Sequence, residues 1–396
     1  MVAYYQSPFR LSTLIAGSLG LCPRISVEEV EDECVKAFGL PEAVLLPSAR
    51  AGIAWVLIAH GTGLPVLCPA FTCREVWFAI QATGAALRLV DLAADGFLMD
   101  PAQLASQQTE QHALILGEIY GYPYALETAG REGAVQPSVR ILDLAMSLPS
   151  SARLARAGTR DVVLLSFGVR KCLSAGWGGV VLTRDSALAT ELRQLRQRAQ
   201  RGLSLREYWC HNCRLVATEV ARTRALYRPL SYYRHLQARS GRKETASVGV
   251  STPANSGIDG PAFTRSPSSL NRSLIAHNLR GIHTQREHRR RLAALYRAGL
   301  NSAPGIQLPP ETSEPLSHFT VRVTADFRAQ IIAALEREGI GVGTLFHFST
   351  RYPASEFPNA ARIAREVLNL PMHTRVSDND VAFICSILRQ AVASHP

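Results

Sequence analysis

The feature that most constrains the fold is a series of short apolar segments, rich in β-branched residues, that alternate with segments of helical periodicity. These runs are continuous rather than alternating with polar residues, so they predict strands covered on both faces. The helical segments between them predict parallel strands joined by crossovers. We therefore expect an α/β fold with a mainly parallel sheet covered by helices. The expected strands lie near residues 65–68, 87–90, 113–116, 139–142, 162–166 and 179–182.

Length and composition fit such a fold. The chain has 396 residues, of which 47% are hydrophobic and 19% charged, so it can bury a large core and is not disordered overall. We expect a large domain over residues 1–270 and a smaller C-terminal α+β domain over residues 271–396, which includes its linking helix and a strand at 319–323. The sequence contains neither eighteen uninterrupted apolar residues nor a convincing signal peptide, so we expect a cytoplasmic location.

Lys171 is the most informative single residue. The expected strand at 162–166 delivers the Ser166 hydroxyl and then, five residues later, the Lys171 amine, while another expected strand is followed at once by Asp143. Open α/β sheets bind ligands at the carboxyl ends of their strands. Taken alone, Lys171 resembles a surface charge, Asp143 a helix cap and Ser166 a small core residue. Their shared position at strand ends favours a common site.

Residues 44–52 add a strand, a tight turn of small residues and a helix whose free N–H groups point at an anion. Ser48 is also a plain helix cap, but Arg50 adds a fixed positive fork beside it. Pyridoxal phosphate needs three groups from a protein: an amine for its aldehyde, a carboxylate for its pyridine nitrogen and hydrogen-bond donors for its phosphate. We therefore expect this cofactor, with Lys171 first capturing its aldehyde and then moving a proton. The expected phosphate-binding residues are Ser48, Ala49, Arg50 and Ser166.

These motifs, with others, resemble the DegT/DnrJ/EryC1/StrS family of sugar aminotransferases, which have the fold of aspartate aminotransferase. The resemblance implies a pyridoxal phosphate-dependent homodimer that moves an amino group from an amino acid, glutamate or glutamine, to a keto sugar nucleotide, usually in polysaccharide biosynthesis. It also implies that Ala145 and Cys73 lie at the cofactor. His347 is a candidate for the substrate side, and a capped or core histidine is an equally good interpretation. The matching blocks are residues 48–52, 68–72, 118–123, 143–145, 166–171, 178–181, 341–348 and 368–373.

Several positions depart from the family pattern. The Asn-x-Arg segment that often reaches the partner subunit's phosphate is not recognisable near residues 263–265, and we expect Arg50 to compensate. The changes at Cys73, Met146 and Cys172 leave open a pyridoxal phosphate enzyme of the same fold that performs dehydration or carbon–carbon bond formation. A non-catalytic scaffold, recruited to a membrane complex through residues 203–236, also stays open. Lysine at position 171, where dehydrating relatives have histidine, favours transamination. The departures are Cys73 for an aromatic residue, Glu118 for His, Met146 for a polar residue and Cys172 for Asn.

Residues 203–260 form the part that the resemblance explains least. Tyrosine, tryptophan and arginine are mixed over 203–236, and a polar stretch at 237–260 is expected to be a loop. The mixed segment suits either a subunit contact or lid, or peripheral contact with a membrane surface. Within it, Cys210-His211-Asn212-Cys213 lacks a second ligand pair, so we predict no metal.

The net charge of +11 raises the question of a polyanionic partner. Part of this charge lies at residues 286–291, on a helical pattern that continues to Tyr296, and we expect these charges to face water. A basic cleft would also attract a nucleotide diphosphate. Nucleic acid binding is therefore not required by the charge.

Overall fold

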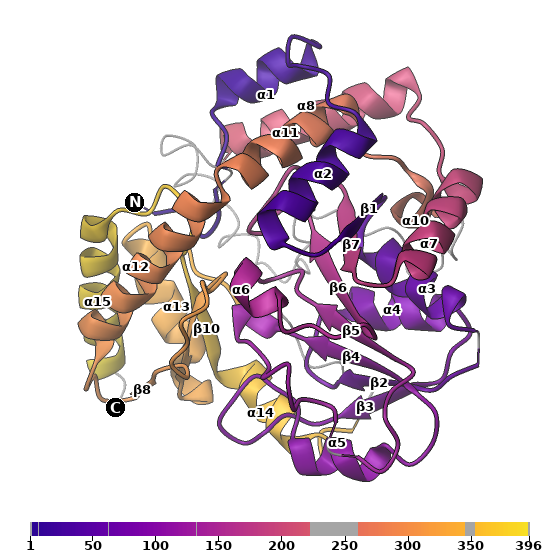
Figure 1. The fold of residues 1–396 in the computed structure, drawn as a ribbon. Coiled ribbons are helices and arrows are strands. Elements are labelled where there is room, and N and C mark those ends of the chain that lie inside the picture. Colours follow the sequence, from indigo (N-terminus) through magenta and orange to yellow (C-terminus); the bar gives the residue numbers. More distant parts are fainter. Residues whose placement is uncertain are drawn as a thin grey trace.

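A seven-stranded sheet forms the centre of the larger part of the molecule (Figure 1). The computed structural model describes residues 2–6, 8–61, 63–131, 133–221, 260–344 and 353–394. The strand order is β1-β7-β6-β5-β4-β2-β3, and only β7 runs against its neighbours. The predicted mainly parallel sheet is thus confirmed. Its strands are β1 (Glu42–Leu46), β2 (Val66–Pro69), β3 (Leu87–Val90), β4 (Ala113–Gly117), β5 (Val139–Asp143), β6 (Asp161–Ser166) and β7 (Gly179–Thr183).

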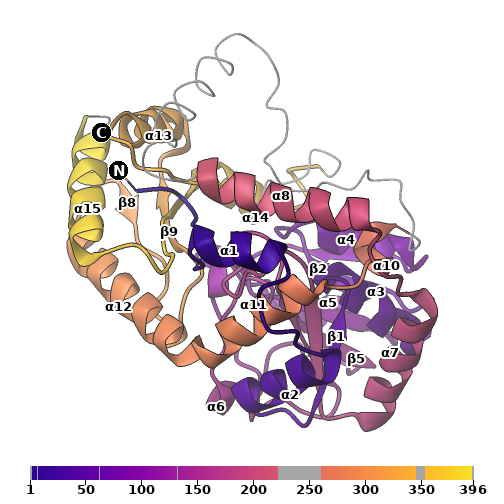
Figure 2. The ribbon, with the colours of Figure 1, turned by 90° about the horizontal axis from the view of Figure 1, so that it is seen from above.

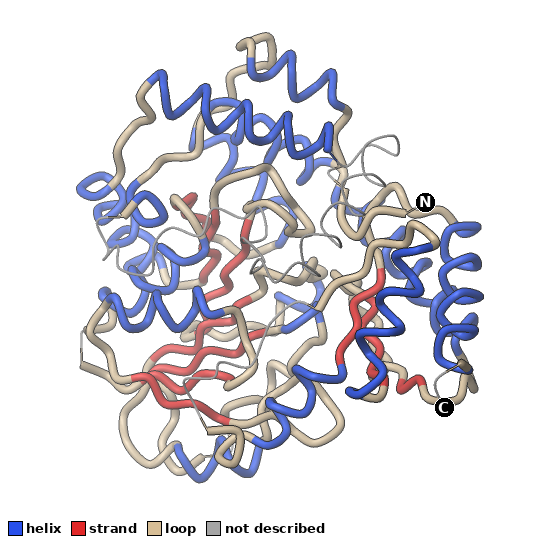
Figure 3. The backbone as a smooth tube through the Cα atoms, turned by 180° about the vertical axis from the view of Figure 1, so that it is seen from behind, coloured by secondary structure: helices blue, strands red, loops and turns tan. Residues whose placement is uncertain are grey.

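Helices cover both faces of this sheet, as the continuous apolar runs predict (Figure 3). Successive strand side chains point to opposite faces, so Val44 packs in the core on the α3 side while Leu45 packs in the core on the α2 side. The expected helix at 27–38 is α2, and a capping box between Ser26 and Glu29 starts it. The helices of this part are α1 (Leu11–Ser18), α2 (Val27–Phe38), α3 (Ala49–Ala59), α4 (Arg74–Ala82), α5 (Pro101–Gln107), α6 (Ser151–Leu154), α7 (Ser186–Ala199), α8 (Leu205–Ala221), α10 (Pro261–Thr264) and α11 (Ser269–Arg280), with the 3-10 turn η1 (Ile119–Gly121).

A smaller antiparallel sheet, in the order β10-β9-β8, lies in the C-terminal part of the chain (Figure 2). The first residues of the chain join this part, because Val2 donates its N–H to Gly339 O at 2.9 Å and accepts from Gly341 N at 2.8 Å. The domain boundary at residue 270 stays a prediction. The elements here are α12 (Ile282–Leu300), β8 (Ile306–Gln307), β9 (Phe319–Val323), η2 (Ala325–Phe327), α13 (Arg328–Arg337), α14 (Pro358–Glu366), β10 (Val367–Leu370) and α15 (Asp378–Ala393).

The expectation that all the charges at residues 286–291 face water is wrong for two arginines on α12. Arg286 and Arg289 are buried. Arg289 Nη1 donates to the carbonyl of Ser317 at 3.0 Å, and Arg286 donates to the carbonyl of Pro149, while burial lowers the pKa of Arg286 to about 10. The long guanidinium side chains satisfy loop carbonyls that helix and sheet leave unpaired, which helical periodicity does not reveal.

Arg140 and Asp161 form a buried ion pair between β5 and β6. The two residues lie opposite each other in the sheet, each is 2% exposed, and Nε and Nη2 of Arg140 donate to the carboxylate at 2.6 and 2.7 Å. The same guanidinium donates to the carbonyls of Leu126 and Ala129. This pair fastens the strand that ends in Asp143 to the strand that ends in Ser166.

Replacing Asp161 by alanine is expected to lower the free energy of unfolding by about 3–5 kcal/mol, because it leaves the Arg140 charge buried without its carboxylate. Urea unfolding of the variant measures the loss. Alanine at the exposed Asp326 is the matched control, with an expected change within about 0.5 kcal/mol. A loss below about 1 kcal/mol at Asp161 would show that the pair contributes little.

Candidate active site

The carboxyl ends of β1, β5 and β6 meet at one edge of the large sheet. Because β7 runs antiparallel to both β1 and β6, it makes these two strands parallel to each other, and Gly179 at its start pairs with both Leu46 and Ser166. The turn after β1 therefore lies beside the end of β6. Asp143 ends the next strand along, β5. Sheet register thus brings together residues that are more than a hundred positions apart.

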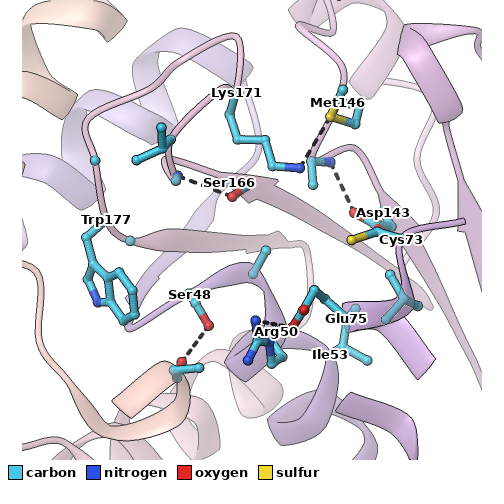
Figure 4. Close-up of a pocket in the computed structure, with 18 of the residues that line it drawn as sticks. Ser48, Arg50, Ile53, Cys73, Glu75, Asp143, Met146, Ser166, Lys171 and Trp177 are labelled. Atoms are coloured by element: carbon cyan, nitrogen blue, oxygen red, sulfur yellow. Dashed lines mark hydrogen bonds and ion pairs between the residues drawn. The ribbon is translucent and has the colours of Figure 1, made fainter. Parts of the chain in front are cut away.

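Lys171 is held by a tight loop between β6 and β7. Phe167 N donates to Gly178 O at 2.9 Å, and Ala175 N donates to Phe167 O at 2.8 Å, so the two arms of the loop are clamped together. Arg170, directly before the lysine, has a φ of 68°, a left-handed conformation that non-glycine residues seldom adopt. This loop directs the lysine amine into the cavity, where Nζ lies 3.3 Å from the sulfur of Met146 (Figure 4).

Asp143 presents a buried carboxylate to the same cavity. Its Oδ1 accepts from Ala145 N at 3.1 Å. Burial raises the pKa of this carboxyl, and the nearby Lys171 opposes that effect. Since desolvation disfavours the ionised form, a cationic partner inside the cavity would relieve the cost. The site therefore suits a cationic group, and a protonated ring nitrogen is one such group.

The N-terminus of α3 forms another side of the cavity. Ser48 caps it: its hydroxyl accepts from Ala51 N at 3.1 Å and donates to Ala262 O at 2.5 Å. The first turn of such a helix offers free N–H groups and a positive dipole end to an anion. Arg50 lies here too, but its guanidinium is ion-paired with Glu75 on α4. Arg50, which we expect to bind the cofactor phosphate, is thus partly neutralised by a carboxylate in the same cavity wall.

All the site residues predicted within the described ranges line one cavity of about 540 Å³ (Figure 4). This volume is in the usual range for small-molecule sites. His347 lies outside the described residues. The roles assigned to the individual residues stay predictions. The residues brought together are Ser48, Ala49, Arg50, Cys73, Asp143, Ala145, Ser166 and Lys171.

Sequence reasoning missed one wall of the cavity, which α8 provides. His211, Arg214, Leu215 and Thr218 line it, at the i, i+3, i+4, i+7 spacing of a single helix face. That spacing was visible in the sequence, but nothing in it indicated which cavity the face meets. Trp177, in the loop after the lysine, was also missed. The rest of the aromatic and basic segment, residues 222–236, and the expected loop at 237–259 lie outside the described residues.

The departures from the family pattern fall in different places. Cys73 and Met146 line the cavity, whereas Cys172 is buried in the core. Glu118 is buried and ion-paired with Arg153, while Ser147 Oγ donates to it at 3.0 Å. Burial raises the pKa of Glu118, and Arg153 opposes the rise. Glu118 therefore braces the strand ends as well as forming part of the cavity wall.

Neither a metal cluster nor a spanning helix is found among the described residues. They contain no group of three or more His, Cys, Asp and Glu side chains placed to hold a metal ion. Cys210 and Cys213 are exposed on α8, while His211 faces the cavity. No described helix is long and apolar enough to cross a membrane.

Pyridoxal phosphate fits this arrangement by the chemistry of its donors. The Lys171 amine matches the aldehyde, the Asp143 carboxylate matches the ring nitrogen, and the capped N-terminus of α3 matches the phosphate. These groups line one cavity. The fold and the site together define the class of pyridoxal phosphate-dependent enzymes with a mainly parallel α/β sheet.

Comparison with known proteins identifies the family. The model of the DegT/DnrJ/EryC1/StrS aminotransferase family matches residues 24–223 and 268–389, so the chain belongs to this family. A Streptomyces venezuelae protein named dTDP-3-amino-3,4,6-trideoxy-alpha-D-glucose transaminase is 29% identical over 329 residues, which are 79% of this chain and 72% of that protein. The predicted family, cofactor and enzyme class are confirmed.

Two solved structures show the same fold. The putative sugar aminotransferase Spr1654 from Streptococcus pneumoniae, in its PMP form, has a TM-score of 0.72 at 17% identity and covers 98% of this chain and 99% of its own. S. venezuelae DesV, in complex with a ketimine intermediate, has a TM-score of 0.69 at 23% identity, over 96% of this chain and 93% of its own. The predicted fold class is thereby confirmed.

Gly179 is expected to be irreplaceable for cofactor binding. A Cβ at this position would lie 2.4 Å from Ala49 N, a backbone atom that has no side-chain freedom to move away. Replacing Gly179 by alanine would therefore displace the N-terminus of α3, and we expect the affinity for pyridoxal phosphate to fall at least about tenfold. Equilibrium titration of the cofactor-free variant measures it. Alanine at Gly202, where a Cβ meets nothing within 4 Å, should bind normally, and equal affinity of both variants would contradict this expectation.

Proposed function

We propose that this aminotransferase moves an amino group from an amino acid, glutamate or glutamine, to the keto group of a sugar nucleotide. The observation that carries the proposal is that Lys171 and Asp143 line one cavity beside the N-terminus of α3. The S. venezuelae relative, whose name describes a dTDP-linked amino sugar, supports the class of acceptor. A cavity with a basic residue in its wall, Arg214, suits an anionic nucleotide.

In this proposal each residue has a defined task. When bound, pyridoxal phosphate supplies an electrophilic aldehyde and an electron-accepting ring. Lys171 holds the cofactor covalently and, once displaced by the substrate amine, moves a proton between carbon atoms as a general base and acid. Asp143, ionised beside the ring nitrogen, keeps that nitrogen protonated. The residues that would hold the phosphate are Ser48, Ala49, Arg50 and Ser166. Cys73 and Ala145 would lie at the ring, and His347 is proposed for the substrate side.

We further propose that the active form is a cytoplasmic homodimer that serves polysaccharide biosynthesis, with domains divided near residue 270. Family membership supports the dimer and the pathway. The described part of the aromatic and basic segment packs within the chain, since Tyr208 Oη donates to the carbonyls of Gly17 and Ser18 on α1. Trp209 on the same helix is 45% exposed. Its ring is therefore accessible to a partner subunit or to a membrane surface.

A spectral titration tests the proposed function. Purified protein with bound cofactor is titrated first with glutamate and glutamine and then with keto sugar nucleotides. The visible cofactor band should bleach with an amino donor and return with a keto sugar nucleotide. Bleaching that only keto acids reverse would refute the sugar acceptor.

The second candidate is a different reaction on the same fold, dehydration or carbon–carbon bond formation. The departures from the family pattern at Cys73 and Met146, which line the cavity near Lys171, would permit it. Under this alternative the protein forms the visible band, yet no amino donor bleaches it. The same titration therefore separates the two candidates.

A further inference from the structure

Helix α8 is fixed against the loop that carries Lys171. Leu215 packs on Gly176 so closely that a Cβ on this glycine would lie 2.7 Å from the leucine Cδ2. His211 lies edge-on to Trp177 with ring centroids 6.3 Å apart, and its Nε2 is 3.2 Å from Asn271 Nδ2. These contacts hold one face of α8 at the cavity wall. The side chains on that face therefore form part of the site.

The charged groups in this cavity are almost all engaged with one another. Arg50 is paired with Glu75, and Glu118 with Arg153 behind the wall. Lys171 and Asp143 are assigned above to the cofactor. One further cation, Arg214, remains in the lining.

His211, which also lines the cavity, does not add to the positive charge of Arg214. Its Nδ1 accepts from Arg265 Nη2 at 3.0 Å. Burial, with help from Arg265 and Arg214, lowers the pKa of His211 to about 4, so the ring is neutral at physiological pH. Its hydrogen bond with Arg265 helps to position α8.

Arg214 is different from the other cations of the lining. Within the described part of the chain its guanidinium has no carboxylate partner, and the residue is exposed at the cavity wall. Arg214 lies close enough to His211 and Arg265 to lower the pKa of both, so an anion at this wall would be attracted by two guanidinium groups. A guanidinium presents a planar fork of donors that matches carboxylate and phosphate oxygens.

We propose that Arg214 binds an oxyanion carried by the substrate and thereby determines which substrates reach Lys171. The proposal rests on the proposed function, because it takes this cavity as the place where both substrates react. Two sources carry the same chemistry: a carboxylate of the amino donor and a phosphate of the nucleotide. In a two-step amino transfer the donor and the acceptor occupy the cavity in turn, so one guanidinium can serve either or both.

The test uses two probes that bind but do not react, glutarate for the donor and thymidine diphosphate for the acceptor. Calorimetric titration of the holoenzyme gives their Kd values, and steady-state kinetics gives KM and kcat for each substrate. In Arg214→Ala, the Kd of at least one probe and the matching KM should rise about ten- to a hundredfold, while kcat changes little. Arg214→Lys should recover part of the loss, because it keeps the charge without the fork. Arg206→Ala, on the same helix but outside the cavity lining, is the matched control and should bind both probes normally.

The two probes distinguish the possible substrates of Arg214. A loss confined to glutarate assigns Arg214 to the donor carboxylate, a loss confined to thymidine diphosphate assigns it to the nucleotide, and a loss of both assigns it to a shared subsite. If the wild-type protein transaminates and Arg214→Ala matches it with both probes, the inference is wrong and the proposed function stands. If the wild-type protein neither transaminates nor binds a probe, both fail.

Discussion

Replacing Lys171 by alanine is expected to reduce transamination by at least about a thousandfold, with fold and cofactor pocket intact. The lysine has two tasks in the proposed reaction, covalent attachment of the cofactor and proton transfer, and loss of a general base alone costs about 10²–10⁴-fold. Among the described residues, Lys171 is the only lysine that lines the cavity. The chain contains only two further lysines, Lys36 and Lys243. Lys36 is exposed on α2, and Lys243 lies outside the described residues.

Initial rates with glutamate and a keto sugar nucleotide measure the effect, and the visible absorbance reports whether the variant still binds cofactor. Alanine at the exposed Lys36 is the matched control and should leave the rate unchanged. A Lys171→Ala protein that kept more than about a tenth of the wild-type rate would contradict the assigned role. Its rate loss would be smaller than the loss expected from removing a general base.

Replacing Asp143 by asparagine is expected to have the second largest effect, a fall in kcat of about 10²–10³-fold. The substitution keeps the size and one hydrogen-bond acceptor but removes the buried charge that keeps the ring nitrogen protonated. Kinetic constants of the variant measure the fall. Asparagine at the exposed Asp95 should change nothing. An Asp143→Asn protein with normal kcat would mean that the ring nitrogen finds another partner.

The same substitution should stabilise the cofactor-free protein at neutral pH. Because burial raises the pKa of Asp143, its ionised form costs free energy in the folded state, and this cost disappears as the pH falls through the folded pKa. The Tm of Asp143→Asn should therefore exceed that of the wild type by about 1–2 °C at about pH 8, and the difference should shrink as the pH falls through the folded pKa of Asp143. A Tm difference that grew as the pH fell would contradict the assignment of a raised pKa to Asp143.

The sequence predicted the sheet and the lysine side of the site because both depend on local patterns. Continuous apolar runs mark buried strands, and a polar residue directly after such a run is placed by the strand itself, as Asp143 and Ser166 are. The turn at Ser48 is equally local, since a small residue, a cap and a helix follow one another in the chain. These features needed no knowledge of distant contacts.

What escaped prediction depends on contacts between distant segments. The α8 wall has clear helical spacing, yet only the packing of Leu215 on Gly176 determines that this face meets the lysine loop. The partner of Arg50, Glu75, lies on another helix, so the ion pair could not be read from the turn. Arg286 was predicted to face water because a charge on a helix usually does, but here it satisfies loop carbonyls. Tertiary contacts decided each of these cases.

Borohydride reduction of the holoenzyme, followed by peptide mass mapping, tests the central claim most directly. The reagent fixes the cofactor to whichever amine holds it, and the three lysines fall in widely separated peptides. We expect the label on the peptide that contains Lys171 and on neither peptide that contains Lys36 or Lys243. A holoenzyme that shows the visible band but leaves residue 171 unlabelled would contradict the account.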